Sequence, residues 1–359
     1  MKKLIGVFLI LAFAMAGCST TATVQASTPE AIKPTVTLVP TVVPTATLMP
    51  TAIPTTIPTA TATPVFTAER QKIQAIMEAY GNVDEKDLTD AYWQKLSDQI
   101  SKYGEAKRIL TLEYHGDNYN MYNGAYSMDP AEFETQMRYL LANDYHFVTG
   151  PELVGYLEGW LALPARSIIL TSDSGAASNL SIPRISALFK GLEAQYGITP
   201  HMISFIWTAS MDPKESNWCK NDACWQFFRD ALNTGYFTFG THTETHRDFS
   251  TLIDADTTWD LQTSMKAIHD NLGINVYGIS WPFEACSTNP KLIANLGFKF
   301  ALGGYSRDRN QLFTYANDNE PLCLPRLFPP NPDGLSGRPG GMTLEQMLDE
   351  AMNQYSPLN

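Results

Sequence analysis

The feature that most constrains the fold is an alternation of short apolar segments with amphipathic ones, which begins at Arg108 and continues almost to the end of the 359-residue chain. Such alternation is typical of strands followed by helices. Strands are predicted at 109–114, 145–149, 167–172, 202–207, 236–240, 276–280, 298–302 and 322–328. Helices are predicted at 129–143, 151–159, 182–196, 223–232, 259–272 and 290–296, and a last helix opens at a capping-box pattern that begins at Thr343.

Seven or eight strand-helix units in roughly 250 residues favour one parallel barrel over two domains. We therefore predict an α/β fold, a distorted barrel of about seven strands, over residues 107–359. A short helical arm is predicted before it at residues 67–106, because apolar side chains recur there at helical spacing, as at Ile73 and Met77. The sequence leaves open whether this arm packs on the barrel, lengthens a stalk or mediates self-association.

The N-terminus has the form of an export signal. Lys2 and Lys3 precede an apolar run, and Gly17 precedes Cys18. A small-residue pair before a cysteine resembles a bacterial lipoprotein signal, so residues 1–18 are predicted to be a signal peptide that ends at Cys18, the acylated residue. An ordinary signal or a short membrane anchor is the alternative, but the run is too short to span a bilayer comfortably. The expected location is the outer face of a bacterial membrane or the cell surface.

Residues 19–66 contain eight prolines and many threonines, and only Glu30 and Lys33 are charged. Such a composition cannot bury a core and favours an extended chain, so this segment is predicted to be a disordered tether between membrane and barrel. The whole chain carries a net charge of −12. An acidic surface repels phosphate backbones, which argues against nucleic acid as a partner.

Four cysteines remain beside Cys18, an even number in a chain predicted to leave the reducing cytoplasm. We predict two disulfides, Cys219–Cys224 and Cys286–Cys323. A cysteine metal cluster is the alternative, but the spacings do not match known cysteine sites.

Two of the six histidines, His242 and His246, lie four positions apart just after the predicted strand 236–240. Neutral imidazoles brought together commonly bind Zn²⁺ or a similar ion, although an isolated pair at this spacing more often consists of polar loop residues satisfied by their neighbours. His115, Asp173 and Trp281 follow the ends of other predicted strands. Because barrel chemistry lies where the strands end, we predict one site at this rim.

These residues together resemble the polysaccharide deacetylases of carbohydrate esterase family 4, from about residue 110 to 328. Four segments carry the resemblance: Leu112-Glu-Tyr-His115, which looks like the opening of the extracellular branch; Thr171-Ser-Asp-Ser-Gly175, against the family's Thr-Phe-Asp-Asp-Gly; His242-Thr-Glu-Thr-His246, against His-Ser/Thr-x-x-His; and Ser280-Trp-Pro-Phe283, against Arg-x-Pro-Tyr/Phe.

The resemblance implies a role for each matching residue. Asp173 would be the catalytic base and His115 the general acid, His242 and His246 would be metal ligands, and Trp281, Pro282 and Phe283 would form the wall of a substrate groove. Two positions depart from the family. Ser174 stands where the metal-binding aspartate is expected, and Ser280 stands where an arginine orients the base.

The implied activity is that of a metal-dependent hydrolase that removes N-acetyl, or less commonly O-acetyl, groups from an acetylated amino-sugar polysaccharide of the cell envelope or outside the cell. The implied ion is zinc, with cobalt or nickel as alternatives. A serine hydroxyl is a poor ligand, so Glu244, Asp117, water or Asp173 itself would have to complete the shell. The alternative functions are a catalytically inactive homologue that acts as a tethered glycan-binding protein, and a scaffold for another envelope protein.

Overall fold

The computed structural model describes residues 66–81, 89–115, 129–179, 181–212, 214, 219, 223–303, 313–329 and 343–352. They belong to one compact unit, Thr61–Asn359. The predicted signal peptide with Cys18, and the tether up to residue 65, lie outside the described residues. No helix within the described ranges is long and apolar enough to cross a membrane.

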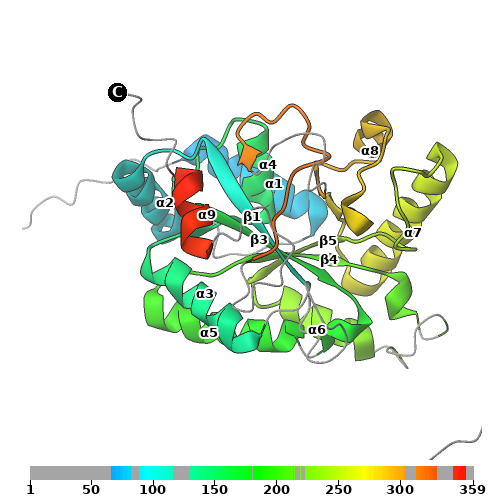
Figure 1. The fold of residues 1–359 in the computed structure, drawn as a ribbon, viewed down its shortest axis with the longest axis horizontal. Helices are drawn as coiled ribbons and strands as arrows, with labels where there is room; N and C mark the ends of the chain where they lie inside the picture. The colour runs from blue at the N-terminus through cyan, green and yellow to red at the C-terminus, as the bar shows by residue number, and fades with distance from the viewer. Residues whose placement is uncertain are drawn as a thin grey trace, which may run out of the picture. The chain divides into compact units, whose positions relative to one another are not determined.

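A curled sheet forms the centre of this unit (Figure 1). Its strands lie in the order β7-β6-β5-β4-β3-β1-β8, and β2 pairs with β3. Every pairing is parallel except that of β1 with β8. The predicted α/β barrel of about seven strands is confirmed, with a short antiparallel β8 that was not predicted. The strands are β1 Arg108–His115, β2 His146–Phe147, β3 Ser167–Ser174, β4 Met202–Ile206, β5 Phe237–Thr241, β6 Gly278–Ser280, β7 Phe300–Leu302 and β8 Thr314–Tyr315.

The segment predicted as a strand at 322–328 bridges β7 and β1 but is not a regular strand. Leu324 pairs with Leu302 of β7, and Leu327 pairs with Leu112 of β1. A continuous ladder is interrupted between them because Pro325 has no N–H group to donate. The segment therefore closes the seam of the barrel by two isolated bridges.

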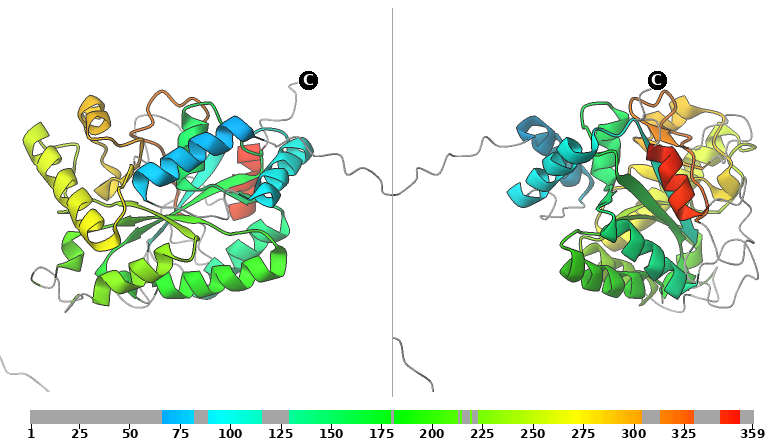
Figure 2. Two further views of the ribbon diagram at one scale, coloured as in Figure 1. Left: turned by 180° about the vertical axis from the view of Figure 1, so that it is seen from behind. Right: turned by 60° about the vertical axis from the view of Figure 1, so that its left-hand side comes forward.

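Helices cover the sheet on both sides (Figures 1 and 2). The longest, α7, begins at Asp254, earlier than predicted, where two aspartates in its first turn complement the helix dipole. The capping box predicted at Thr343 is confirmed, since Gln346 N donates to Thr343 Oγ1 and Thr343 N donates to Gln346 Oε1. The barrel helices are α3 Pro130–Ala142, α4 Gly150–Leu157, α5 Ser181–Tyr196, α6 Ala223–Leu232, α7 Asp254–Leu272, α8 Pro290–Asn295 and α9 Leu344–Met352, with short 3₁₀ turns η2 Ala176–Asn179, η3 Ala209–Met211 and η4 Pro282–Glu284.

Side chains of the central strands alternate between two apolar cores, as the two-residue period of a strand requires. Ile109 of β1 and Ile169 of β3 belong to one core, whereas the residues that follow them directly, Leu110 and Leu170, belong to the other. Counting by twos from Ile109 and Ile169 reaches the polar residues at the carboxyl ends of both strands. The alternation thus places Glu113, His115 and Asp173 on one face of the sheet.

The two helices of the arm, α1 Thr67–Tyr80 and α2 Asp90–Tyr103, pack on the barrel. Tyr80 O accepts a hydrogen bond of 2.8 Å from Asn275 N, and its ring centroid lies 4.3 Å from that of Tyr277. On α2, Tyr92 Oη donates to Glu152 Oε1 of α4. The sequence leaves three roles open for the arm, and the structure shows one of them: the arm packs on the barrel.

Both predicted disulfides form, Cys219–Cys224 and Cys286–Cys323, with sequence separations of 5 and 37 residues. The second joins the loop after η4 to the segment that closes the barrel. Since a cross-link limits the unfolded chain more when its loop is longer, replacing Cys286 and Cys323 by serine should lower the free energy of unfolding by about 2–4 kcal/mol. Chemical denaturation measures the change. The same replacement at Cys219 and Cys224 serves as control and should cost less; an equal or smaller loss for the longer loop would contradict the expectation.

Candidate active site

Asp173, the penultimate residue of β3, lies at the centre of the polar rim, and its side chain is only 5% exposed. Arg326 holds both carboxylate oxygens, Nη1 to Oδ1 and Nη2 to Oδ2, each at 2.9 Å. Ser280 Oγ donates to Oδ1 at 2.7 Å. Burial alone would raise the pKa of Asp173, but Arg326 and then His242 outweigh burial and hold the pKa well below its usual range. Asp173 is therefore an anion at neutral pH.

His115 and Glu113 reach the same point from the neighbouring strand, because β1 and β3 pair in parallel with His115 opposite Asp173. His115 Nε2 lies 3.9 Å from Asp173 Oδ2 and 3.6 Å from Glu113 Oε1. Glu113 Oε1 also lies 2.9 Å from Arg326 Nη2, whereas its buried Oε2 has no hydrogen-bond partner among the residues that the structure describes. Burial raises the pKa of Glu113 and lowers the pKa of His115.

His242 follows β5 and is held in one orientation. Its Nδ1 lies 2.9 Å from the carbonyl oxygen of Ser280, which can only accept, so Nδ1 carries the hydrogen. Nε2 is then the unprotonated nitrogen, 3.7 Å from Asp173 Oδ2. Burial lowers the pKa of His242 to about 4, which keeps the imidazole in the neutral, metal-binding form.

The loop that carries both histidines is fixed by Asp260 of α7, which is completely buried. Its two carboxylate oxygens accept hydrogen bonds from the backbone N–H groups of Glu244 and Thr245, at 2.7 and 3.1 Å, and from the hydroxyl of Thr245. His246 follows directly, with its ring centroid 4.8 Å from that of His242. A helix of the outer layer thus positions the histidine pair.

Backbone strain is concentrated around this loop. Among the described non-glycine residues with positive φ, four lie here: Thr243 at 69°, His246 at 53°, Phe283 at 55° and Glu284 at 57°. Such conformations cost free energy and persist where the surrounding structure enforces them, commonly at functional sites.

Two exposed aromatic rings flank His246. Trp207, after β4, has its ring centroid 5.0 Å from that of His246, and the ring centroid of Phe283 lies 4.9 Å from it. Trp207 is 37% exposed and Phe283 is 69% exposed. The indole nitrogen of Trp207 donates to Glu244 O, which fixes the ring on the histidine loop. The rim therefore offers two apolar ring faces beside a histidine.

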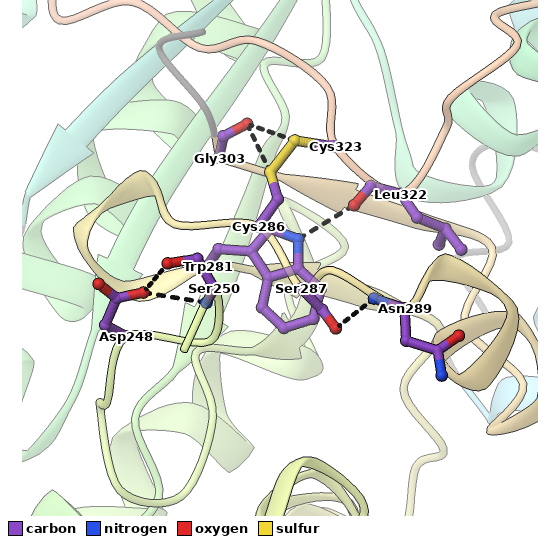
Figure 3. Close-up of a disulfide and its surroundings, with 9 residues drawn as sticks. All are labelled: Asp248, Ser250, Trp281, Cys286, Ser287, Asn289, Gly303, Leu322 and Cys323. Atoms are coloured by element: carbon purple, nitrogen blue, oxygen red, sulfur yellow. Dashed lines mark hydrogen bonds between the residues drawn. A yellow bond between two sulfur atoms is a disulfide. The ribbon is translucent and has the colours of Figure 1, made fainter. Parts of the chain in front are cut away.

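Trp281, predicted to line the groove, is fully buried. Its ring packs on Phe249 at 5.1 Å, and its indole nitrogen donates to Leu322 O at 3.0 Å (Figure 3). Pro282 is buried as well. The prediction that these residues form a groove wall therefore needs correction for Trp281 and Pro282, which present no ring face to a ligand. Trp281, the first residue after β6, turns toward the segment 322–328 that closes the barrel. Of the three predicted wall residues, Phe283 alone is exposed.

Ser174, at the position of the expected metal-binding carboxylate, faces two other hydroxyls. Its Oγ accepts from Ser204 Oγ at 2.9 Å and lies 3.3 Å from Ser172 Oγ. Of the two other acidic groups considered for the shell, the Glu244 carboxylate accepts from Thr208 Oγ1 at 2.5 Å, and Asp117 lies outside the described residues.

A second carboxylate is present at the centre, although not at position 174. One ligand atom each from Glu113, His115 and Asp173 lies within 4.8 Å of the others, a group that could hold a metal ion. The unpartnered, buried Oε2 of Glu113 and the neutral Nε2 of His242 fit such an ion. The guanidinium of Arg326 opposes it, since a cation already lies 2.9 Å from both carboxylates.

Of the residues that the sequence singles out, Asp173, His115 and His242 lie together, with His246 beside His242. Glu113 and Arg326 were missed as site residues. Glu113 was detectable, since it is a carboxylate in an apolar strand two residues before His115. No local pattern marks Arg326, which lies in an irregular segment more than 150 residues after Asp173.

Part of the chain matches a known family model. Residues 162–301 match the family model described as polysaccharide deacetylase. The match spans β3 to β7, with Asp173, His242 and His246, but not Glu113, His115 or Arg326. Comparison with curated protein sequences gives no significant match.

Several solved structures share the fold. A polysaccharide deacetylase from Bacillus cereus is 19% identical with a TM-score of 0.51, over 69% of this chain and 70% of its own. IcaB from Ammonifex degensii is 19% identical with a TM-score of 0.52, over 70% and 98%. The deacetylase PplD of Streptococcus pyogenes, in complex with acetate, is 18% identical with a TM-score of 0.52, over 69% and 99%. The chain thus has the distorted barrel fold of these solved structures.

Proposed function

We propose that this chain is a metal-dependent hydrolase that removes N-acetyl, or less commonly O-acetyl, groups from an acetylated amino-sugar polysaccharide. The observation that carries the proposal is the convergence of an anionic carboxylate, Asp173, with His115 and His242 at the carboxyl ends of β3, β1 and β5, with nitrogen-to-oxygen distances of 3.9 and 3.7 Å. The family-model match supports the substrate class.

The residues present fit a divalent ion such as Zn²⁺, with Co²⁺ or Ni²⁺ as alternatives. His242 and His246 would supply neutral nitrogens, and Asp173 with Glu113 would supply the negative charge that Ser174 does not. When bound, such an ion would act as a Lewis acid toward the acetyl carbonyl and its attacking water.

The chain's own residues have separate tasks in this proposal. Asp173, fixed by Arg326 and Ser280, accepts the proton of the attacking water. His115, which is neutral at rest and whose Nε2 lies 3.9 Å from Asp173 Oδ2, takes up the proton that Asp173 has accepted from water and donates it to the leaving nitrogen. The exposed rings of Phe283 and Trp207 offer faces on which a sugar ring can stack.

The cellular setting follows from the disulfides and the N-terminal sequence. Two disulfides favour an oxidising compartment outside the cytoplasm. With the lipoprotein-like signal, we infer that the chain is exported and anchored to the outer face of a membrane through Cys18, with the Pro/Thr-rich segment as a tether.

A second candidate is a catalytically inactive, tethered glycan-binding protein. Arg326 favours it, because its guanidinium occupies both oxygens of Asp173 and repels a metal ion at the same place. In that case the exposed Phe283 and Trp207 would bind sugar without turnover. A scaffold would have neither activity nor glycan affinity.

One experiment separates these candidates. The mature chain is freed of metal, reloaded with Zn²⁺, Co²⁺ or Ni²⁺, and assayed for acetate release from N-acetylglucosamine oligomers, with oligomer binding measured by calorimetry. The hydrolase should release acetate only with metal. Oligomer binding without acetate under any metal would favour the inactive binder, and absence of both would favour a scaffold.

Ser174→Asp should tighten metal binding about tenfold or more. Ser174 is the last residue of β3 and follows Asp173 directly. A carboxylate at this position that turns from the Ser172 and Ser204 hydroxyls toward the site adds a negative charge there, and about 1.4 kcal/mol of attraction gives a tenfold change. The measurement is the Kd for Zn²⁺ by competition with a chelator. Ser174→Asn, of the same shape without the charge, is the matched control, and equal affinities for the two variants would refute the expectation.

A further inference from the structure

We propose that Arg326 is the positioning residue of this site and takes over, from another part of the chain, the task of an arginine that position 280 lacks. This inference rests on the proposed function. Arg326 lies in the segment that closes the barrel between β7 and β1, and its side chain is 1% exposed.

Arg326 holds two carboxylates in a fixed relation. Nη1 contacts Asp173 Oδ1, and Nη2 contacts both Asp173 Oδ2 and Glu113 Oε1, all at 2.9 Å. A planar guanidinium that grips both oxygens of a carboxylate fixes its rotation as well as its position. Without it, two buried acidic groups on neighbouring strands would repel each other. Arg326 therefore sets the direction in which Asp173 presents its remaining lone pairs.

The segment that carries Arg326 is held on both sides. Toward β7, Leu324 N donates to Ala301 O at 2.8 Å and Gly303 N donates to Leu324 O at 3.0 Å. Toward β1, Leu327 N donates to Thr111 O and Glu113 N donates to Leu327 O, both at 2.9 Å. The guanidinium is thus aimed into the barrel from a segment that cannot shift without breaking pairs to both neighbouring strands.

The Cys286–Cys323 disulfide adds a covalent anchor three residues before Arg326. Beside it, the buried indole of Trp281 donates to Leu322 O (Figure 3). Trp281, which follows β6 directly, therefore supports the arginine-bearing segment.

A serine at position 280 is consistent with the transfer of the arginine's task from position 280 to Arg326. The Ser280 hydroxyl donates at 2.7 Å to Asp173 Oδ1, the oxygen that Arg326 Nη1 contacts at 2.9 Å. A long side chain at position 280 would compete with Arg326 for this oxygen, whereas a serine leaves room for it. Arg326 and Ser280 thus both fix Asp173 Oδ1, and an arginine at either position 326 or position 280 should be able to orient this carboxylate.

The test compares Arg326→Gln, Arg326→Lys and the double variant Arg326→Gln/Ser280→Arg with the wild type, in the mature chain. We expect Arg326→Gln to lower kcat about 100-fold, the scale of a misplaced catalytic group, with little change in KM. Its Zn²⁺ affinity should not fall, because the lost side chain is a cation. Arg326→Lys keeps the charge without the fork and should be intermediate, and the double variant should recover at least about tenfold of the lost kcat.

Each other outcome is informative. If kcat per folded molecule is unchanged in Arg326→Gln, or if the double variant restores the melting temperature but not kcat, Arg326 is only structural and the proposal is overturned. If the wild type releases no acetate with any metal, the proposed function fails. Crystal structures then decide the positioning role alone: Asp173 should leave its orientation in Arg326→Gln and regain it in the double variant, and an unmoved Asp173 in Arg326→Gln overturns it.

Discussion

Asp173→Asn is expected to lower kcat for acetate release by about 10²–10⁴-fold, the usual contribution of a general base. The amide keeps the shape of the side chain but cannot take up a proton from water. It also cannot pair with Arg326 as an anion, although Glu113 remains beside that guanidinium. Initial rates with the metal-loaded protein, measured well below its melting temperature, give the effect.

A matched control separates chemistry from stability. Asp144 lies at the arm, where it accepts hydrogen bonds from Gln99, Lys102 and Tyr103. Asp144→Asn should lower the melting temperature without changing kcat. If Asp173→Asn retains wild-type kcat, or if the two variants lose activity in proportion to their loss of stability, Asp173 is not the base.

His242→Ala should weaken metal binding by at least about 100-fold, the upper end of the loss seen when only an outer partner of a ligand is removed. The expectation follows from the fixed ring, whose Nδ1–H donates to Ser280 O and whose Nε2 faces Asp173. Metal content after dialysis and a chelator-competition titration measure the change. Acetate release should fall in parallel.

His269→Ala is the control for this variant, because His269 lies in the last turn of α7, on its exposed side, and should bind no metal. It should keep wild-type metal content and activity. If His242→Ala keeps its full metal content, the ion is held by Glu113, His115 and Asp173 alone. The loop that carries His242 and His246 would then not be part of the metal site.

The fold and half of the site follow from local pattern. Strand and helix periods identify the barrel, and the rule that barrel chemistry lies at the carboxyl ends selects Asp173, His115 and His242. Their approach to each other needs no further information, since the parallel register of β1 and β3 sets His115 opposite Asp173. The alternation of strand side chains also explains why Glu113 joins them.

The rest depends on tertiary contacts that leave no local trace. Arg326 reaches the site because Leu324 and Leu327 pair with strands on either side of it. Trp281 is buried because its indole hydrogen bond to Leu322 draws it under the closing segment. An aromatic residue in a wall motif and one in a core have the same sequence signature, so only the structure distinguishes Trp281 from the exposed Phe283.

The balance of charge at the centre is the main physical question about this chain. Arg326 brings Asp173 and Glu113 together, but the same cation weakens the attraction of the pair for a metal ion. The neutral His242 and the unpartnered Oε2 of Glu113 favour an ion, whereas Ser174 and Arg326 oppose it. Catalysis requires that the attraction of these ligand atoms for the metal ion is greater than the repulsion between the ion and Arg326.

The most direct measurement is acetate release from N-acetylglucosamine oligomers by the Zn²⁺-loaded wild type and by Asp173→Asn, side by side, each with and without a chelator. The account predicts acetate and a matching amount of free amine from the wild type, with loss of both on chelation and in Asp173→Asn. Equal release by the two proteins, or release that survives removal of the metal, would contradict it.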